Sequence, residues 1–278
     1  MIVAGIDVGG KNLHIVVQKD GQILGRASGS TGIEKAKAVE QLYDEVLKKA
    51  GITRKDVERV VATGSSAKRV AFANGSIPDA AADARGVNKL VPSARTVIDV
   101  GAEEGRAIKL SSEGRVLDFA INGKCAAGTG TFVEAMSRAL EVSVDEISKI
   151  TFQSTQSLSI NAQCAVFGES EVVSLIHQKT PKADIARAVM NAIAGRVASV
   201  ARIVGLENDV VMIGGMAKNA GFVDSLKKSI DMNVVVPEDP DYMGARGAAE
   251  AALAGAMTEE VKARGLEKET LSVGKVKR

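Results

Sequence analysis

The chain has 278 residues, of which 45% are hydrophobic and only 3% aromatic, with no tryptophan. A chain of this length is longer than a domain with a single hydrophobic core usually is. We therefore predict two packed lobes with a cleft between them. The 36 basic and 34 acidic residues leave a net charge of +2, which argues against nucleic acid or an anionic membrane as a partner. No basic leader opens the chain, and no stretch approaches the roughly 18 apolar residues of a membrane span. We therefore expect a cytoplasmic protein.

The first third of the chain alternates short apolar runs with turn residues. It predicts strands at residues 2–7, 13–18, 22–27 and 57–63, with an amphipathic helix at 32–50 between the last two. A second round begins with predicted strands at 96–100, 107–110 and 115–121. Because both rounds open with a strand that ends in Asp-Val-Gly, at Asp7 and at Asp99, the sequence predicts a duplicated α/β domain.

The rest of the chain predicts mostly helices. They are expected at 131–140, 166–178, 184–204, 221–229 and 245–256, with strands at 208–213 and 233–236 and a charged, fraying tail beyond 258. We expect residues 1–95 together with about 245–278 to form lobe I. Residues 96–244 are expected to form lobe II, which carries both cysteines.

A glycine-rich turn after a buried strand lets backbone amides approach a phosphate, so Asp7-Val8-Gly9-Gly10-Lys11-Asn12 is a candidate phosphate loop. An ordinary hairpin turn is the alternative interpretation of this segment. The second copy, Asp99-Val100-Gly101-Ala102-Glu103-Glu104-Gly105, favours the functional interpretation. Carboxylates from two lobes, Asp7 and Asp99, can hold Mg²⁺ and orient a water for attack on a γ-phosphate.

A third glycine-rich element, Val211-Met212-Ile213-Gly214-Gly215-Met216-Ala217, ends a predicted strand in paired glycines. Glycine backbone carries no side chain, so the adenosine of a nucleotide can lie close against it. Gly214, Gly215 and Met216 are therefore candidate nucleotide-binding residues. Tight packing of the strand on the next helix explains the glycines equally well.

The three elements together resemble the sugar kinase, Hsp70 and actin superfamily. The resemblance implies two RNase H-like lobes, each a mixed sheet flanked by helices, with ATP and Mg²⁺ in the interlobe cleft. Three further segments are informative: Asp83-Ala84-Arg85-Gly86, Lys124-Cys125-Ala126-Ala127-Gly128-Thr129-Gly130 and Cys164-Ala165-Val166-Phe167-Gly168-Glu169-Ser170-Glu171. They are similar to a narrower group, the BadF/BadG/BcrA/BcrD-type ATPases, which comprise activators of 2-hydroxyacyl-CoA dehydratases and ATPase subunits of benzoyl-CoA reductase.

That resemblance implies an ATP-hydrolysing protein that delivers a low-potential electron from a ferredoxin or flavodoxin to an acyl-CoA-processing enzyme. It implies that Cys125 and Cys164 share one 4Fe-4S cluster with a second subunit, in a homodimer or a pseudo-symmetric heterodimer, and that Gly128 and Gly130 bind a cofactor. Each cysteine precedes a predicted helix, whose positive dipole end would face an anionic cluster. Two small buried hydrophobes are the alternative interpretation of these cysteines. His14 and His177 lie in no zinc-like spacing with either one.

The chain departs from the activators at both phosphate loops. Gly10 and Lys11 replace a Ser and a Thr, and Ala102, Glu103 and Glu104 replace Gly-Gln-Asp. Lys11 could supply charge to a phosphate, and Glu103 could position or deprotonate the attacking water. The form of the second loop favours the reductase branch. Two alternatives stay open, a sugar-type kinase with Glu103 as its base and a non-catalytic actin-like regulatory protein.

Overall fold

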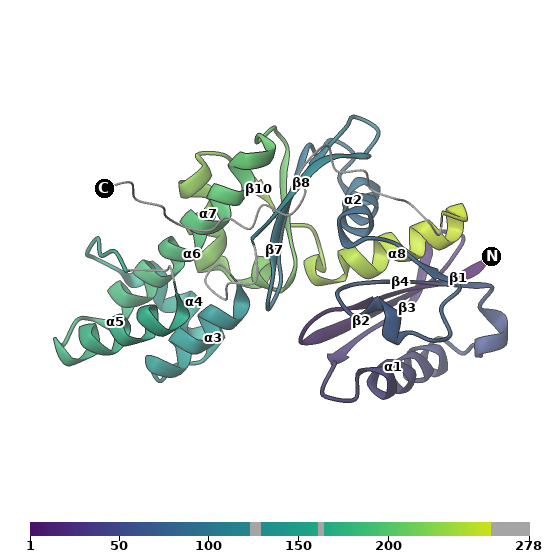
Figure 1. The fold of residues 1–278 in the computed structure, drawn as a ribbon, viewed down its shortest axis with the longest axis horizontal. Helices are drawn as coiled ribbons and strands as arrows, with labels where there is room; N and C mark the ends of the chain where they lie inside the picture. Colours follow the sequence, from purple (N-terminus) through teal and green to yellow (C-terminus); the bar gives the residue numbers. More distant parts are fainter. Residues whose placement is uncertain (123–128, 161–163, 257–278) are drawn as a thin grey trace, which may run out of the picture.

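Two five-stranded mixed sheets, with helices between them and on their outer faces, make up the fold (Figure 1). The structure is a computed structural model that describes residues 1–122, 129–160 and 164–256. Within these ranges, no helix is both long and apolar enough to cross a membrane.

The first sheet, sheet A, has the strand order β3-β2-β1-β4-β5. Its strands are β1 (Ile2–Val8), β2 (Asn12–Lys19), β3 (Gln22–Ser30), β4 (Arg59–Thr63) and β5 (Gly75–Ser76). β1 runs antiparallel to β2 and parallel to β4. Helix α1 (Lys35–Lys49) covers its outer face and buries Val39, Tyr43, Val46 and Leu47, which lie on one side of the helix at the expected spacing.

The second sheet, sheet B, repeats this arrangement in the order β10-β9-β6-β7-β8. Its strands are β6 (Thr96–Val100), β7 (Gly105–Leu110), β8 (Val116–Asn122), β9 (Val210–Ile213) and β10 (Val234–Val235). β6 runs antiparallel to β7 and parallel to β9, as β1 does to β2 and β4. The long helix α6 (Lys182–Val204) packs on β7 and β8. The duplicated strand pattern predicted from the two Asp-Val-Gly segments is confirmed.

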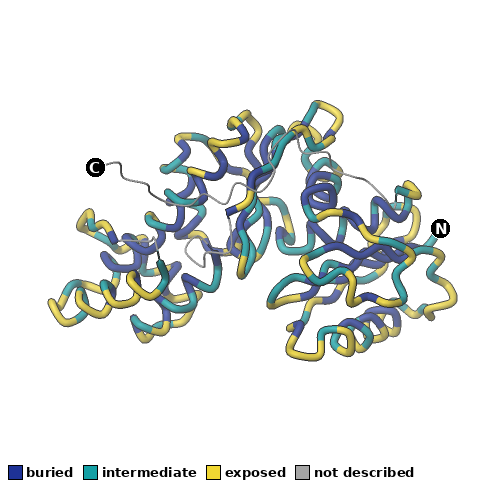
Figure 2. Tube along the Cα trace, in the orientation of Figure 1, coloured by how far each residue is buried: buried dark blue, intermediate teal, exposed yellow. Residues whose placement is uncertain are grey.

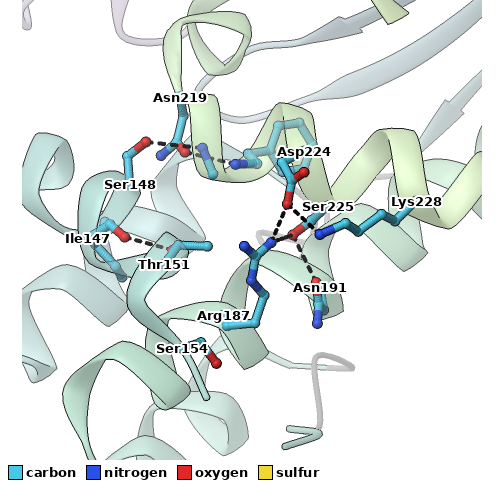
Figure 3. Close-up of polar contacts among 12 residues, drawn as sticks. Ile147, Ser148, Thr151, Ser154, Arg187, Asn191, Asn219, Asp224, Ser225 and Lys228 are labelled. Carbon is cyan, nitrogen blue, oxygen red and sulfur yellow. Dashed lines mark hydrogen bonds and ion pairs between the residues drawn. The ribbon is translucent and has the colours of Figure 1, made fainter. Parts of the chain in front are cut away.

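The remaining helices of this half are α3 (Gly130–Ala139), α4 (Val144–Ile150), α5 (Ala165–His177) and α7 (Ala220–Ile230). Side-chain hydrogen bonds fasten α4, α6 and α7 together (Figure 3). Arg187 of α6 donates to Asp224 at 2.6 Å and to Ser225 at 3.2 Å, both on α7. Asn219 caps the first turn of α7, and Ser148 of α4 accepts a backbone N–H from that same turn. Since Asn219 follows the short 3-10 turn η4 (Gly215–Lys218), these bonds also fix the loop that leaves β9.

Helices α2 (Asp79–Leu90) and α8 (Met243–Ala254) lie between the two sheets (Figure 1). α8 packs on β1, β2 and β4, whereas α2 packs on α8 and on sheet B. The two helices approach very closely, because a Cβ at Gly247 would lie 1.7 Å from the carbonyl oxygen of Ala82 and one at Gly86 would lie 2.2 Å from that of Met243. Alanine and glycine on both helices therefore let the backbones touch, and the dark, buried centre of Figure 2 includes this contact.

The strands and helices predicted from sequence occur, with ends that differ by up to three residues. Helices α2 and α4 and the two-residue strand β5 were not predicted. The predicted tail beyond 258 lies outside the described residues. The lobe boundaries at 95, 96, 244 and 245 stay a prediction, in which α2 is counted with lobe I although it packs on sheet B.

Candidate functional site

A cavity of about 750 Å³ opens between the two sheets, at the carboxyl ends of β1, β4, β6 and β9. Ligands of open α/β sheets bind at such strand ends. The structure brings eleven of the predicted site residues to this one cavity: Asp7, Gly9, Gly10, Lys11, Asn12, Asp99, Gly101, Ala102, Glu103, Gly214 and Gly215. Residues that lie up to 208 positions apart in sequence thus share one site, and their role in nucleotide binding stays a prediction.

The two aspartates occupy equivalent places in the two sheets. Each is the last but one residue of its strand, Asp7 of β1 and Asp99 of β6. Each lies opposite a basic or titratable side chain of the neighbouring antiparallel strand, His14 for Asp7 and Arg106 for Asp99. The two carboxylates therefore face one cavity from opposite sides through the same local geometry.

The loops after the aspartates also match. The N–H of Gly9 donates to the carbonyl of Asn12 at 3.0 Å, and the N–H of Gly101 donates to that of Glu104 at 2.9 Å. Both turns close in the same way, as the duplication predicts. The hairpin interpretation of the first loop is therefore true of its backbone, and it does not exclude a phosphate loop.

Glycines at the ends of the neighbouring parallel strands leave room for these carboxylates. Gly64 follows β4 and has φ +93°, and a Cβ there would lie 2.4 Å from Oδ1 of Asp7. Gly214 follows β9 and has φ +83°, and its Cβ would lie 2.3 Å from Oδ1 of Asp99. A side chain at either position would be strained by the positive φ and would displace the aspartate. A glycine at position 214 thus leaves room for the side chain of Asp99. Neither interpretation from the sequence gave this reason for the glycine.

Arg106 neutralises part of a dense carboxylate cluster. Its guanidinium lies 2.8 Å from Glu104, 3.0 Å from Asp79, 3.4 Å from Asp83 and 3.6 Å from Asp99. Burial alone would lower the pKa of Arg106, but the four carboxylates outweigh burial and hold the guanidinium protonated. Because Asp79 and Asp83 belong to α2, this arginine also ties sheet B to the helix between the sheets.

Burial raises the pKa of three carboxyl groups in the cavity. It raises the pKa of Asp7 from 3.8 to about 6, with His14 opposing the rise and Asp79 and Asp99 adding to it. Burial likewise raises the pKa of Asp99 and, more strongly, that of Asp83. The described lining contains seven carboxyl groups and three permanently charged cations, so the cavity would carry a surplus of negative charge if all seven were ionised. A divalent cation would relieve it.

Comparison with known proteins identifies the family. The model of the BadF/BadG/BcrA/BcrD ATPase family matches residues 4–252. This chain belongs to that family. It is 37% identical to the activator of lactoyl-CoA dehydratase from Anaerotignum propionicum, over 90% of this chain and 96% of that protein. It is 33% identical to a benzoyl-CoA reductase subunit from Thauera aromatica, over 89% of this chain and 92% of that protein.

Among solved structures, the chain is similar to the activator of the 2-hydroxyisocaproyl-CoA dehydratase from Clostridium difficile with bound ADPNP. The TM-score is 0.85 at 33% identity, and the match covers 96% of this chain and all of the other. The expected actin-like, two-lobed α/β fold is confirmed. The preference for the reductase branch gains no support here, because the identity to the dehydratase activator is the higher of the two.

A second ionic link across this ATPase-family cleft was not predicted. Nε2 of His14, on β2, lies 3.3 Å from Oδ2 of Asp241, which lies just before α8. Lys218 of η4 donates to the same oxygen at 2.6 Å. Burial raises the pKa of Asp241, but the hydrogen bonds from His14 and Lys218 outweigh burial and lower it overall. The pair therefore joins sheet A to the segment that leads into α8.

The remaining predicted site residues lie elsewhere. Met216 is buried in the core of sheet B, outside the residues that line the cavity, and its predicted role in nucleotide binding stays a prediction. Gly130, the first residue of α3, donates its N–H to the carbonyl of Gly101 at 2.9 Å and sits beneath the second loop. Cys125 and Gly128 lie outside the described residues.

Cys164 immediately precedes α5, as predicted, and is the N-cap residue of that helix. It is only partly buried. Beside it, Val166 and Phe167 are 68% and 67% exposed, on a helix that is mostly yellow in Figure 2. This setting disagrees with a buried hydrophobic cysteine. Among the described residues, no three or more His, Cys, Asp or Glu side chains are grouped so as to hold a metal ion.

Sequence reasoning missed Asp79, Arg106, Gly64 and Asp241 as residues of the cavity, and it noted Asp83 only as part of the family-like segment Asp83-Ala84-Arg85-Gly86. Asp79 had a local signal, because it follows a proline and begins an alanine-rich segment, as the first turn of a helix often does. Arg106 had a weaker one. Its place opposite Asp99 follows only from the register of the β6–β7 hairpin.

Proposed function

We propose that this chain is an ATP-hydrolysing iron–sulfur protein that passes a low-potential electron to an acyl-CoA dehydratase or reductase. The observation that carries the proposal is the pair of equivalent Asp-Gly loops that face one cavity from the two sheets. Membership of an ATPase family supports it, as do the ADPNP in a similar structure and the names of the relatives.

ATP would lie with its phosphates between the two loops. The amides of Gly9, Gly10 and Gly101 would face phosphate oxygens, as would Lys11, and Gly214 and Gly215 would border the adenosine. The carboxylate surplus of the cavity fits Mg²⁺ held by Asp7 and Asp99. Bound magnesium would offset the charge of the phosphates during transfer.

Glu103 would position the attacking water. It lines the cavity in the loop after Asp99, where it extends toward Gly10 of the other loop. A carboxylate in this position can accept the proton of the water as it attacks the γ-phosphate.

Cys125 and Cys164 would ligate a 4Fe-4S cluster. The partial exposure of Cys164 at the N-terminus of the 13-residue helix α5 fits a thiolate ligand, because the helix end favours negative charge. Two thiolates supply half of the usual four-ligand set, so a second subunit would supply the rest. The exposed Val166 and Phe167 fit contact with that subunit. The cluster would accept one electron at a time and donate it to the acyl-CoA-processing enzyme.

ATP hydrolysis would act on Cys164 through the lobes. The phosphate loops belong to different sheets, so loss of the γ-phosphate would change the angle between the sheets about α2 and α8. α5 would move with sheet B, and the surroundings of Cys164 would change with it. A ferredoxin or flavodoxin would supply the electron.

Anaerobic purification tests the proposal. We expect a brown protein with about four iron atoms per dimer and with ATPase activity. Added to a 2-hydroxyacyl-CoA dehydratase or to a benzoyl-CoA reductase lacking its ATPase component, it should restore turnover of one of the two. A protein that stays free of iron after reconstitution with iron and sulfide would overturn the electron-transfer role. Phosphorylation of a sugar would favour the kinase alternative.

A further inference from the structure

Lys11, which lines the cavity, forms an ion pair with Glu134. Lys11 belongs to the first phosphate loop, between β1 and β2, and Glu134 lies on α3, 123 positions later in the chain. The Nζ atom of Lys11 lies 2.6 Å from Oε1 and 2.5 Å from Oε2 of the carboxylate. Both side chains are partly exposed, at 46% and 32%. The pair therefore joins the two halves of the molecule at the rim of the cavity.

The partner helix is fastened to the second phosphate loop. The N–H groups of Gly130 and Thr131 donate to the carbonyls of Gly101 and Ala102, each at 2.9 Å, and the hydroxyl of Thr131 also donates to Ala102 at 2.8 Å. Glu134 lies one helical turn further along α3. The ion pair thus closes a chain of contacts that runs from the first loop through α3 to the second loop.

A neighbouring contact depends on the adjacent residue of the first loop. A Cβ at Gly10 would lie 2.1 Å from Oε2 of Glu103, so the Glu103 side chain occupies the space that any larger residue at position 10 would need. Gly10 and Lys11 in one loop therefore meet Glu103 and Glu134 from the other half. Of these contacts, the one between Gly10 and Glu103 joins the two phosphate loops directly, whereas Lys11 reaches α3.

We propose that Glu134 and the terminal phosphate of the nucleotide compete for Lys11, so that this pair senses whether a γ-phosphate is present. The inference rests on the proposed nucleotide site. Lys11 lines the cavity, and its long, flexible stem lets the ammonium change partners. A partly exposed Lys–Glu pair is weak, whereas a γ-phosphate presents more negative charge and several acceptor oxygens. ATP would take Lys11 from Glu134, and ADP would leave the pair intact.

The consequence for the molecule is a nucleotide-dependent contact on α3. With ADP or without nucleotide, Lys11 holds α3 to the first loop. With ATP, Lys11 turns inward and α3 keeps only its bonds to the second loop. Lys11 thereby acts as a specificity residue for ATP over ADP. Glu134 is a positioning residue, because its hold on Lys11 sets the affinity for ATP relative to ADP.

A double-mutant cycle tests this competition. The dissociation constants of Mg²⁺-bound ADPNP and ADP are measured for the wild type, Glu134→Gln, Lys11→Met and the double variant. Glu134→Gln should tighten ADPNP binding about two- to five-fold, the strength of a partly exposed ion pair, and leave ADP binding unchanged. In the Lys11→Met background the same change should have no effect. Glu146→Gln, an exposed glutamate on α4, is the control for loss of one negative charge and should alter neither constant.

Two results overturn the competition. Equal tightening of ADPNP and ADP by Glu134→Gln would show a general charge effect, and tightening that persists with Met at position 11 would show that Lys11 is not involved. Either can occur in a wild type that binds and hydrolyses ATP, which leaves the proposed function standing. A wild type that binds ADPNP without hydrolysing ATP would refute the function alone, whereas one that binds neither nucleotide would refute both.

Discussion

Asp7→Asn should stabilise the nucleotide-free protein at neutral pH although it removes a proposed catalytic group. Burial in the cleft raises the pKa of Asp7 from 3.8 to about 6, which means that the ionised carboxylate is disfavoured in the folded state. Each pKa unit corresponds to 1.36 kcal/mol, so ionisation costs the fold at most about 3 kcal/mol. Asp7 borders an open cavity, and solvent there reduces the expected gain to about 1–3 kcal/mol.

The gain should depend on pH in a defined direction. Between pH 3.8 and about 6 the folded state holds a proton on Asp7 that the unfolded state has lost, so the stability of the wild type falls as pH rises through this window. Asparagine never ionises and lacks this loss. The free energies of unfolding of wild type and variant should therefore agree near pH 4 and differ most above pH 6.

Magnesium and nucleotide should offset this difference. A cation at Asp7 favours the carboxylate, so with Mg²⁺ and ADPNP at a hundredfold excess over the dissociation constant the wild type should gain about 2.7 kcal/mol, and Asp7→Asn much less. Denaturant unfolding measures the free energy of unfolding of each protein at pH 4 and at pH 7, with and without ligand. Asp145→Asn, on the exposed first turn of α4, is the control and should show no gain at pH 7. A variant that is less stable than wild type at pH 7 without ligand would refute the reasoning.

Four further changes probe other parts of the molecule. Asp99→Asn should abolish ATP hydrolysis and keep the fold, and turnover near the parent rate would remove Asp99 from the site. Glu103→Gln should slow hydrolysis by on the order of 10²-fold at nearly constant ATP affinity, so an equal loss of affinity would assign it to binding. Cys164→Ser should lower iron content to near zero and weaken dimerisation together, whereas unchanged iron content and an unchanged dimer mass in solution would contradict cluster ligation. Gly247→Val, whose Cβ would meet the carbonyl of Ala82, should cost about 1–3 kcal/mol of stability in denaturant unfolding, and an unchanged midpoint would argue against the close α2–α8 contact.

The strands and both aspartate loops could be predicted because their signals are local. An apolar run that ends in Asp-x-Gly can be recognised from a few residues. Because this pattern occurs twice, it predicted the duplicated domain. Helix α2 had a local signal only at its start, where Asp79 follows a proline. Its buried surface consists mainly of alanines and a glycine that lie against α8 and sheet B, so no stripe of large apolar residues marks it.

The ionic partners of the cavity could not be predicted for a different reason. Arg106 meets Asp99 through strand register, but it meets Asp79 and Asp83 only because α2 crosses from sheet A to pack on sheet B. That crossing depends on contacts between residues far apart in the chain. Gly64 and Gly214 likewise show their purpose only when the neighbouring strand is known, since each accommodates an aspartate of that strand.

The duplication also sets two ionic links across the cleft, and they are not equivalent. In each link, an aspartate at the start of a helix between the sheets contacts a side chain of the sheet that the helix packs against. Asp79 of α2 meets Arg106 of sheet B, and Asp241 before α8 meets His14 of sheet A. Arginine is always charged, whereas histidine is charged only when protonated, and Asp241 already has Lys218 as a permanent partner. Sheet B is therefore held to α2 by a permanent ionic contact, whereas the contact of sheet A with the entry to α8 runs through a histidine. Any opening of the cleft that keeps buried charges paired should begin on the His14 side, because separating Arg106 from its carboxylates would leave buried charges uncompensated.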